Sequence, residues 1–97
     1  MVVISKSALN QFIKKHPLAQ GAALDWYSES KQADWSNFSE LKAILPTTDY
    51  VGNDLYIFNL GGRKYRLIAR IIFAVRTIYI RFVGTHEEYN KVKLSDL

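Results

Sequence analysis

The sequence contains no cysteine, and this absence excludes a disulfide framework and any metal site built on thiolate ligands. No run of 18 apolar residues occurs, so we expect no transmembrane helix. The N-terminal segment Met1–Lys6 turns polar too soon to be a signal peptide. Together these absences favour a cytoplasmic protein, which is what we expect.

The residues that are present are typical of a globular protein. The chain has 97 residues, of which 48% are hydrophobic, and this predicts one domain over residues 1–97 rather than a disordered chain. A chain of this length buries roughly 60% of its unfolded surface, which is enough for one modest core.

Charge is distributed unevenly along the chain. Residues 1–62 hold five lysines and six acidic residues, a net charge of −1, whereas residues 63–97 hold five arginines, three lysines and three acidic residues, a net charge of +5. A basic half of this kind favours a polyanionic partner or an acidic protein partner. A solvated sheet face could carry the same charges, so charge alone leaves both interpretations open.

The first third of the chain predicts a short strand followed by two helices. The apolar run 2–4 is typical of a strand, and Ser7 is placed to cap the first helix. His16 and Pro17 end that helix, because the residue before proline avoids the helical region. Pro17 then suits the first turn of the second helix. One face of that helix carries mostly small residues: Ala19, Ala22, Ala23, Trp26, Ser30 and Ala33.

The middle of the chain predicts one more short helix and then a change to strands. Asn37 and Glu40 have the spacing of a capping box, and Pro46 ends the helix that they open. Residues 47–49 are expected to form a loop. From Leu55 to Leu60 the hydrophobic period is two, which indicates a strand, and the following Gly-Gly pair indicates a hairpin.

The last third predicts two longer strands and a terminal helix. Residues 63–75 and 77–83 have the pattern of strands, with Gly84 ending the second. Residues 85–88 have the pattern of a capping box that opens a short helix. Helices first and an antiparallel meander afterwards indicate an α+β domain with helices on one sheet face.

Alternation along the predicted strand 63–75 separates the two faces of the sheet. One face is largely apolar and is expected to meet the core: Tyr65, Leu67, Ala69, Ile71 and Phe73. On the strand 77–83 we expect Ile78, Ile80 and Phe82 to point inward, and Thr77, Tyr79, Arg81 and Val83 to point outward. The polar residues expected on the outer face are then Lys64, Arg66, Arg70, Tyr79 and Arg81. Four cations around an aromatic ring suit a phosphate backbone with a stacked base, and a solvated antiparallel face is an equally good interpretation.

The first candidate catalytic residue is a histidine near the end of the chain. His86 and Tyr89 stand three positions apart on the predicted last helix and therefore share a face. Histidine is the usual general acid or base near neutral pH, and a purely structural role at the helix start is the alternative. Asn59, beside the Gly-Gly turn, is better explained by a hydrogen bond at the strand end. His16 precedes a proline in a loop, and no function is predicted for it.

Metal and cofactor chemistry finds little support in the sequence. The two histidines lie far apart with no spacing typical of a metal site, and there is no glycine-rich phosphate loop. The residues allow a metal-independent reaction that lysine, arginine, histidine and tyrosine carry out, so we expect no metal and no cofactor.

Five segments between residues 35 and 92 resemble the HigB family of toxin–antitoxin modules. They are Trp35–Lys42, Asp49–Gly52, Phe58–Gly62, Lys64–Ile68 and Tyr79–Tyr89. The segments from Phe58 to Ile68 and from Arg81 to Tyr89 are the specific ones, and the helices match less specifically. The resemblance implies a RelE-like α+β fold, in which N-terminal helices pack on one face of a curved, mainly antiparallel sheet.

The resemblance also implies a function and partners. Members of this family are toxins of type II toxin–antitoxin modules, mRNA interferases that cut messenger RNA in the ribosomal A site. The implied partners are a HigA-like helix-turn-helix antitoxin and mRNA on the ribosome, with operator DNA bound only through the antitoxin complex. No membrane partner is expected.

The implied reaction assigns roles to residues of this chain. The RNA 2′-hydroxyl attacks the adjacent phosphorus and the 5′-oxygen leaves, so a base, an acid and cations are needed. We expect Arg66 to stabilise the phosphate, His86 to act as acid or base, Tyr89 to assist, and Lys64 to bind phosphate or act as base. The residues expected to contact RNA are Asn59, Arg63, Arg70, Tyr79 and Arg81.

Two positions depart from the family pattern, and two other functions stay open. Arg63 stands where the family has a polar asparagine, and Asn90 stands where an aspartate follows the tyrosine; activity would differ here if that aspartate takes part in catalysis. One alternative is a non-catalytic RNA- or ribosome-binding module that uses the same basic face. The other is a degenerate toxin that acts as antitoxin partner and co-repressor.

Overall fold

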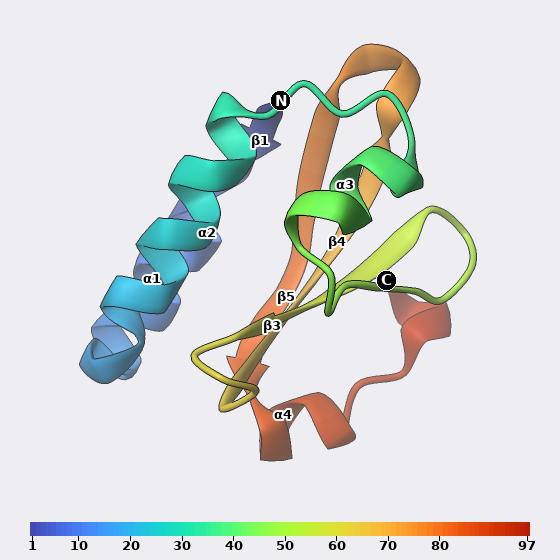
Figure 1. Cartoon of the computed structure of the whole chain (residues 1–97). Helices are drawn as coiled ribbons and strands as arrows, with labels where there is room; N and C mark the ends of the chain where they lie inside the picture. The colour runs from blue at the N-terminus through green and yellow to red at the C-terminus, as the bar shows by residue number, and fades with distance from the viewer.

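Five strands form one mixed sheet in the computed structural model, which describes residues 1–97 (Figure 1). The sheet order is β1-β5-β4-β3-β2, and the strands are β1 (Val2–Ile4), β2 (Asp49–Tyr50), β3 (Leu55–Leu60), β4 (Tyr65–Ile72) and β5 (Thr77–Thr85). The strands from β2 to β5 pair antiparallel, and β1 joins β5 in parallel. The predicted α+β class and the mainly antiparallel sheet are confirmed.

Four α-helices accompany the sheet. They are α1 (Lys6–Lys15), α2 (Gln20–Gln32), α3 (Phe38–Ile44) and α4 (His86–Asn90), and short 3-10 turns cover 17–19, 73–75 and 94–96. The predicted cap of the first helix was wrong by two positions, because α1 starts directly after β1 and Ser5 is its N-cap residue. The cap of α3 is confirmed, since the Asn37 side chain accepts a hydrogen bond from the Glu40 backbone N–H at 2.9 Å. None of these helices has the length and apolar character needed to span a membrane.

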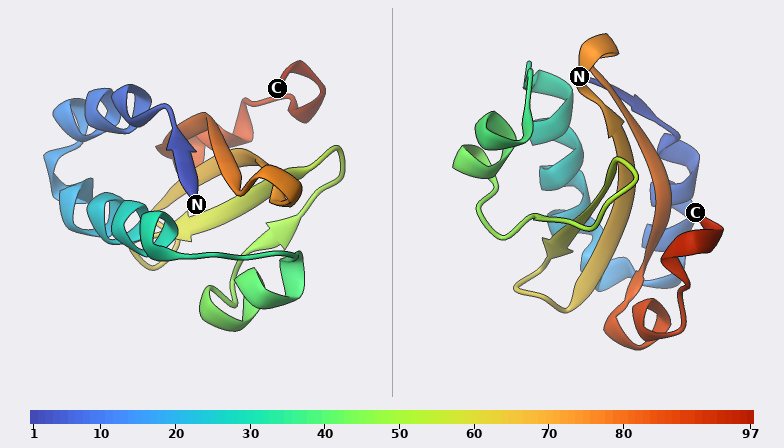
Figure 2. Two further views of the ribbon diagram at one scale, coloured as in Figure 1. Left: turned by 90° about the horizontal axis from the view of Figure 1, so that it is seen from above. Right: turned by 90° about the vertical axis from the view of Figure 1, so that its right-hand side faces the viewer.

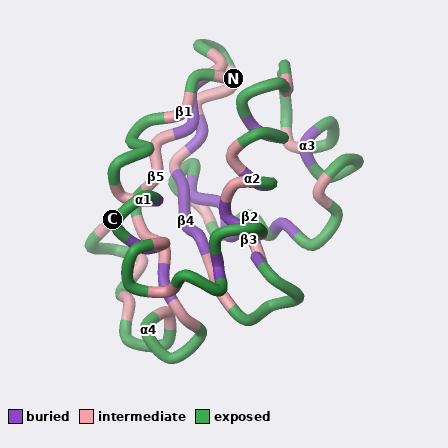
Figure 3. Tube along the Cα trace, turned by 90° about the vertical axis from the view of Figure 1, so that its left-hand side faces the viewer, coloured by how far each residue is buried: buried purple, intermediate pink, exposed green.

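A main core lies between the helices and one face of the sheet. It joins residues of α1, α2 and α3 to the inner face of β3, β4 and β5, and its largest members include Leu9, Trp26, Leu41, Phe58, Leu67 and Ile78. The predicted apolar face of β4 is confirmed, because Leu67, Ala69 and Ile71 are buried in this core. In Figure 3 β4 runs through the interior of the molecule.

The opposite face of the sheet has a small core of its own, which the C-terminal segment covers. Leu55, Ile57 and Ile68 are buried there. The residues packed over them are Phe82, Tyr89, Val92, Leu94 and Leu97. In the right-hand view of Figure 2 the sheet is curved, with α2 and α3 on one side and the C-terminal segment on the other. The outer face is therefore only partly solvated, and this limits how much of it RNA could contact.

A β-bulge changes the predicted alternation of β5. The pairing of β4 with β5 shifts between Ile68 and Ala69, which pair with Phe82 and Ile80, so Arg81 is the extra residue. After the bulge, Phe82 packs in the smaller core and Val83 against the main core. The predictions that Phe82 points into the main core and that Val83 points outward were therefore wrong.

Three predicted strand boundaries were also wrong. The strand predicted over 63–75 is shorter, because residues 63–64 lie in the hairpin turn and residues 73–75 form a 3-10 turn, which leaves Tyr65–Ile72 for β4. Gly84 does not end the last strand, because β5 continues to Thr85 and pairs there with Tyr65. A Cβ at Gly84 would lie 2.6 Å from the Phe82 ring, so close packing explains the glycine. Residues 49–50, of which 49 was predicted as loop, form the two-residue strand β2, whose pairing with β3 leaves no periodic signal in so short a segment.

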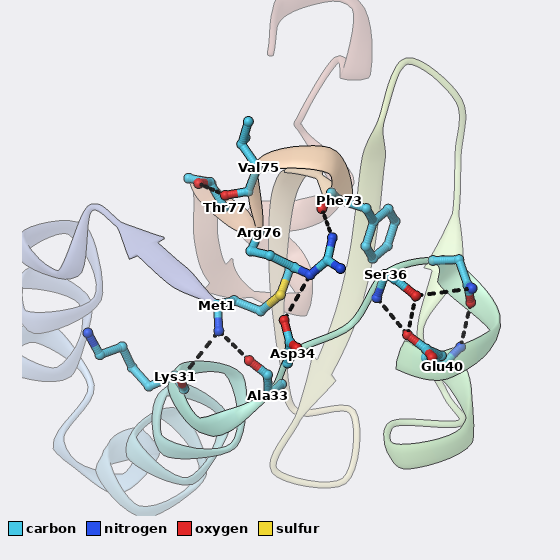
Figure 4. A network of polar contacts seen from close by, with 11 residues as sticks. Met1, Lys31, Ala33, Asp34, Ser36, Glu40, Phe73, Val75, Arg76 and Thr77 are labelled. Carbon is cyan, nitrogen blue, oxygen red and sulfur yellow. Dashed lines mark hydrogen bonds and ion pairs between the residues drawn. The ribbon is translucent and has the colours of Figure 1, made fainter.

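The turn of the β4–β5 hairpin is tied to the segment between α2 and α3 (Figure 4). Arg76 takes the left-handed conformation, with φ of 50°, and its Nε donates to Asp34 Oδ1 at 2.8 Å. Its guanidinium also donates to the Phe73 carbonyl, and its own carbonyl accepts from the Val2 N–H at 2.7 Å. This network replaces the glycine that such a turn commonly uses.

Candidate active site

The short helix α4 presents two of the predicted catalytic residues. The predicted capping box is confirmed: Thr85 Oγ1 accepts from the Glu88 N–H at 3.2 Å, and Glu88 Oε1 accepts from the Thr85 N–H at 2.8 Å. This backbone hydrogen bond from Thr85 is the main cause that lowers the pKa of Glu88. With its first turn held in this way, α4 places the rings of His86 and Tyr89 6.1 Å apart in an edge-on arrangement.

Arg66 joins these two residues from β4. Its guanidinium carbon lies 4.5 Å from the centre of the Tyr89 ring, and its Nε is buried without a hydrogen-bond partner. Opposite Arg66 on β5 stands Gly84, against which Phe82 and Glu88 pack closely. A ring holds the guanidinium by its quadrupole and leaves its positive charge unneutralised, unlike a carboxylate. An arginine held in this way keeps its charge available to bind a phosphate.

Lys64 and Arg63 lie in the turn that enters β4. This turn precedes Tyr65, whose backbone pairs with Thr85 at the start of α4, so both cations belong to the same end of the sheet as His86. Both side chains are exposed, and neither makes a hydrogen bond or ion pair within the chain. Arg81, the exposed bulge residue, likewise has no partner. The structure thus brings the predicted catalytic residues to one end of the sheet.

The other predicted RNA-contacting residues are engaged within the protein. Arg70 donates to the carbonyls of Asn53 at 2.7 Å and Leu97 at 2.9 Å, which fastens the C-terminal segment. Tyr79 stands opposite Arg70 in the sheet register and is half-buried. Asn59 donates to the Thr47 carbonyl at 3.1 Å, the strand-end hydrogen bond that the sequence favoured for it. Arg70 and Asn59 therefore have structural tasks that do not require RNA.

The structure adds one residue to this end of the molecule that sequence reasoning had left without a function. His16, at the end of α1, has its Nε2 3.9 Å from Glu88 Oε1 of α4. Its ring lies 4.9 Å from that of Phe12, and Phe12 in turn meets Tyr65 edge-on at 5.5 Å. No signal in the sequence could have revealed this, because the fold alone brings the two helices together.

The collected side chains define what the site can do chemically. It offers guanidinium and ammonium groups for phosphoryl oxygens, an imidazole for proton transfer and a phenol beside it. No group of three or more His, Cys, Asp or Glu side chains is placed where it could hold a metal ion.

Comparison with known proteins identifies the family of the chain. Residues 19–92 match the model of a family described as the RelE-like toxic component of a toxin–antitoxin system, HigB. An mRNA interferase HigB of Escherichia coli O6:H1 is 29% identical over 94 residues, covering 95% of this chain and 91% of that protein. The mRNA interferase toxin HigB of Escherichia coli strain K12 and the mRNA interferase HigB of Shigella flexneri are each 30% identical, covering 93% of this chain and 88% of those proteins. The chain therefore belongs to the HigB family of RelE-like toxins of toxin–antitoxin systems.

Proposed function

We propose that this toxin is an endoribonuclease that cleaves translated mRNA on the ribosome, by metal-independent attack of the RNA 2′-hydroxyl on the adjacent phosphate. The observation that carries the proposal is Arg66, held over the Tyr89 ring beside His86 with no carboxylate to neutralise it. The names of its relatives, which are mRNA interferases, support the substrate.

Each group in the site has a role in this reaction. Arg66 stabilises the negative charge that builds up on the phosphoryl oxygens, and Lys64 either adds to this or acts as base. His86 transfers a proton as acid or base, and Tyr89 positions Arg66 and assists that transfer. Arg63 and Arg81 attract the RNA backbone electrostatically.

Arg70 and Asn59 serve RNA binding indirectly in this scheme. Arg70 holds the C-terminal segment against the sheet, and the hydrogen bond of Asn59 to Thr47 fixes the strand that pairs with β4. Their substitution should therefore reduce stability first and cleavage second.

The ribosome has a positioning role in the proposal. The site is a small, exposed group of side chains at one end of a sheet, with no pair of catalytic carboxylates, so it can hold little of an RNA by itself. A ribosome that presents the mRNA would supply the missing orientation. A HigA-like helix-turn-helix antitoxin would neutralise the toxin, and the complex of the two would bind operator DNA.

Tightly controlled expression in a bacterial host tests the activity. Growth and transcript 5′ ends are followed together for the wild type, Arg66→Ala and His86→Ala, with the amount of folded protein measured for each. We expect growth arrest with new 5′ ends inside translated codons for the wild type alone. Normal growth with unaltered transcripts would instead favour a binding or co-repressor role.

The chemistry is tested by an mRNA that carries one 2′-deoxynucleotide at a mapped cut site. On ribosomes programmed with this mRNA, the wild-type protein should leave the modified linkage intact and still cut an unmodified copy. Cleavage of the modified linkage at the normal rate would rule out attack by the 2′-hydroxyl.

A further inference from the structure

A surface pocket of about 400 Å³ lies next to α4 and is not used by the reaction described above. It is formed where the last turns of α1 meet β5 and α4, at the lower end of the molecule in Figure 1. The side chains that matter most for its chemistry are Gln11, Phe12, Lys14, Lys15, His16 and Glu88. Its volume falls within the range of roughly 300–1,000 Å³ that is usual for small-molecule sites.

The charges around this pocket are arranged for a ligand that carries both an anion and polar donors. Lys14 and Lys15 are exposed in the last turn of α1, and neither makes a side-chain hydrogen bond or ion pair. Glu88 of α4 lines the same pocket, with its carboxylate 3.9 Å from His16 Nε2 and held by the Thr85 N–H at 2.8 Å. Cations and a fixed carboxylate in one pocket suit a phosphate and a base with N–H groups, respectively.

The pocket also offers a partly exposed aromatic ring. His16 packs against Phe12 with 4.9 Å between ring centroids and 39° between the ring planes, and about 32% of the His16 side chain remains exposed. Phe12 is buried and meets Tyr65 edge-on, so buried neighbours support one side of the imidazole. Such a supported ring can accept a stacked nucleobase.

The position of the pocket relates it to the candidate active site. Glu88 belongs to the same five-residue helix as His86 and Tyr89. Tyr65, which contacts Phe12, immediately precedes Arg66 on β4, and the two side chains point to opposite faces of the sheet. A nucleotide in this pocket would therefore lie at the same end of the sheet as the residues that meet the scissile phosphate, on the opposite face.

We propose that this pocket is a subsite for a single mRNA nucleotide that flanks the scissile bond. Lys14 and Lys15 bind its phosphate, the His16 ring stacks on its base, and Glu88 accepts a hydrogen bond from the base's exocyclic amino group. Adenine N6 and cytosine N4 carry that amino group where guanine and uracil carry a carbonyl oxygen, so the subsite selects adenine and cytosine over guanine and uracil. The inference rests on the proposed ribonuclease function, because it assigns the nucleotide to the RNA that is cut.

Binding of mononucleotides to the full-length toxin tests the subsite without any cleavage. The amide resonances of residues 11–16 and 88 are followed during titration with AMP, CMP, GMP, UMP and inorganic phosphate. AMP and CMP should shift these resonances at lower concentration than GMP and UMP, and phosphate alone should bind more weakly still. Equal binding of UMP, or shifts confined to other residues, would overturn the proposal whatever the toxin does to mRNA.

Variants of exposed residues test the role of individual side chains in nucleotide binding. Replacing both Lys14 and Lys15 with alanine should weaken nucleotide binding roughly tenfold. Lys31→Ala is the matched control, since Lys31 is also exposed in the last turn of a helix but lies outside the pocket. Glu88→Gln should remove the preference against UMP, because an amide can donate to a uracil carbonyl. A preference that survives this substitution would contradict the role of Glu88.

Cut-site mapping on ribosomes distinguishes mRNA from ribosomal RNA as the source of the nucleotide. If the pocket holds mRNA, Glu88→Gln should lose base preference at one fixed distance from the cut. A base preference that is unchanged in this variant would mean that the pocket does not read the mRNA base, and would overturn the proposal.

Discussion

The cations at the two ends of the β4–β5 hairpin differ in whether they are paired with groups of the protein. At the turn, Arg76 is paired with Asp34 and with the Phe73 carbonyl. At the open end, Arg66 has only the Tyr89 ring, and Lys64 has no partner within the chain. All three residues contribute equally to the positive charge of the C-terminal half. The difference in pairing, rather than the charge itself, distinguishes a cation that stabilises the fold from one that is able to bind a substrate phosphate.

The largest expected effect at the open end concerns proton transfer. Replacing His86 with alanine removes the only imidazole of α4, and cleavage on programmed ribosomes should slow by about 10²–10⁴-fold. His86 is exposed and lies at the first position of the helix after the cap, so the melting temperature should hardly change. A folded His86→Ala protein that cuts at the wild-type rate would remove His86 from the mechanism.

The ring that orients Arg66 gives the next largest effect. Tyr89→Leu removes the cation–π contact and should slow cleavage about 5- to 30-fold, as the loss of an interaction of about 1–2 kcal/mol would. Tyr89→Phe keeps the ring and should retain most of the activity. If Tyr89→Phe cleaves as slowly as Tyr89→Leu in single-turnover assays, the phenol hydroxyl rather than the ring is responsible for the rate.

Close packing at the open end predicts a clear stability effect. The Cβ of Gly84→Ala would lie 2.6 Å from the Phe82 ring and 3.1 Å from the Glu88 Cβ, so the free energy of unfolding should fall by about 1–3 kcal/mol. Gly21→Ala is the control, because nothing lies within 4 Å of the position that its new Cβ would take, and it should raise stability by about 0.4–1 kcal/mol. Equal denaturation midpoints for the two variants would contradict this packing.

The smallest effect is the pH dependence of the α4 cap. Because the hydrogen bond from Thr85 lowers the pKa of Glu88 in the folded state, the carboxylate stabilises the fold above its unfolded pKa. This contribution is lost as the pH falls through the lower, folded pKa. The wild type should therefore be slightly more stable than Glu88→Gln at pH 7, and denaturant midpoints should converge below about pH 4. A difference that persists in acid would show that charge is not its cause.

Features with local causes could be predicted from the sequence. The strand Leu55–Leu60, the inner face of β4 and the capping box at Thr85 each follow from a few neighbouring residues, and each is confirmed. Helical spacing likewise predicted that His86 and Tyr89 share a face of α4, whereas the resemblance to HigB, and not the local pattern, singled out Arg66. Their roles in the reaction remain predictions.

Features that depend on distant partners could not be predicted. The bulge at Arg81 arises from the pairing register between β4 and β5, and no residue type in the sequence predicts it. The bond of Arg70 to Leu97 depends on where the C-terminal segment packs. The approach of His16 to Glu88 depends on α1 lying along β5. In each case tertiary contacts, rather than the local pattern, decide the position of the side chain.

The most direct test compares one cation from each end of the hairpin. Arg66→Ala and Arg76→Ala each remove one positive charge, and both are assayed for single-turnover mRNA cleavage on programmed ribosomes and for denaturant stability. We expect Arg66→Ala to lose about 10²–10³-fold in rate with its stability intact. Arg76→Ala should keep the wild-type rate and lose about 1 kcal/mol or less of stability, because its ion pair is exposed. Equal losses of rate in the two variants would show that total charge, not the unpaired Arg66, drives cleavage.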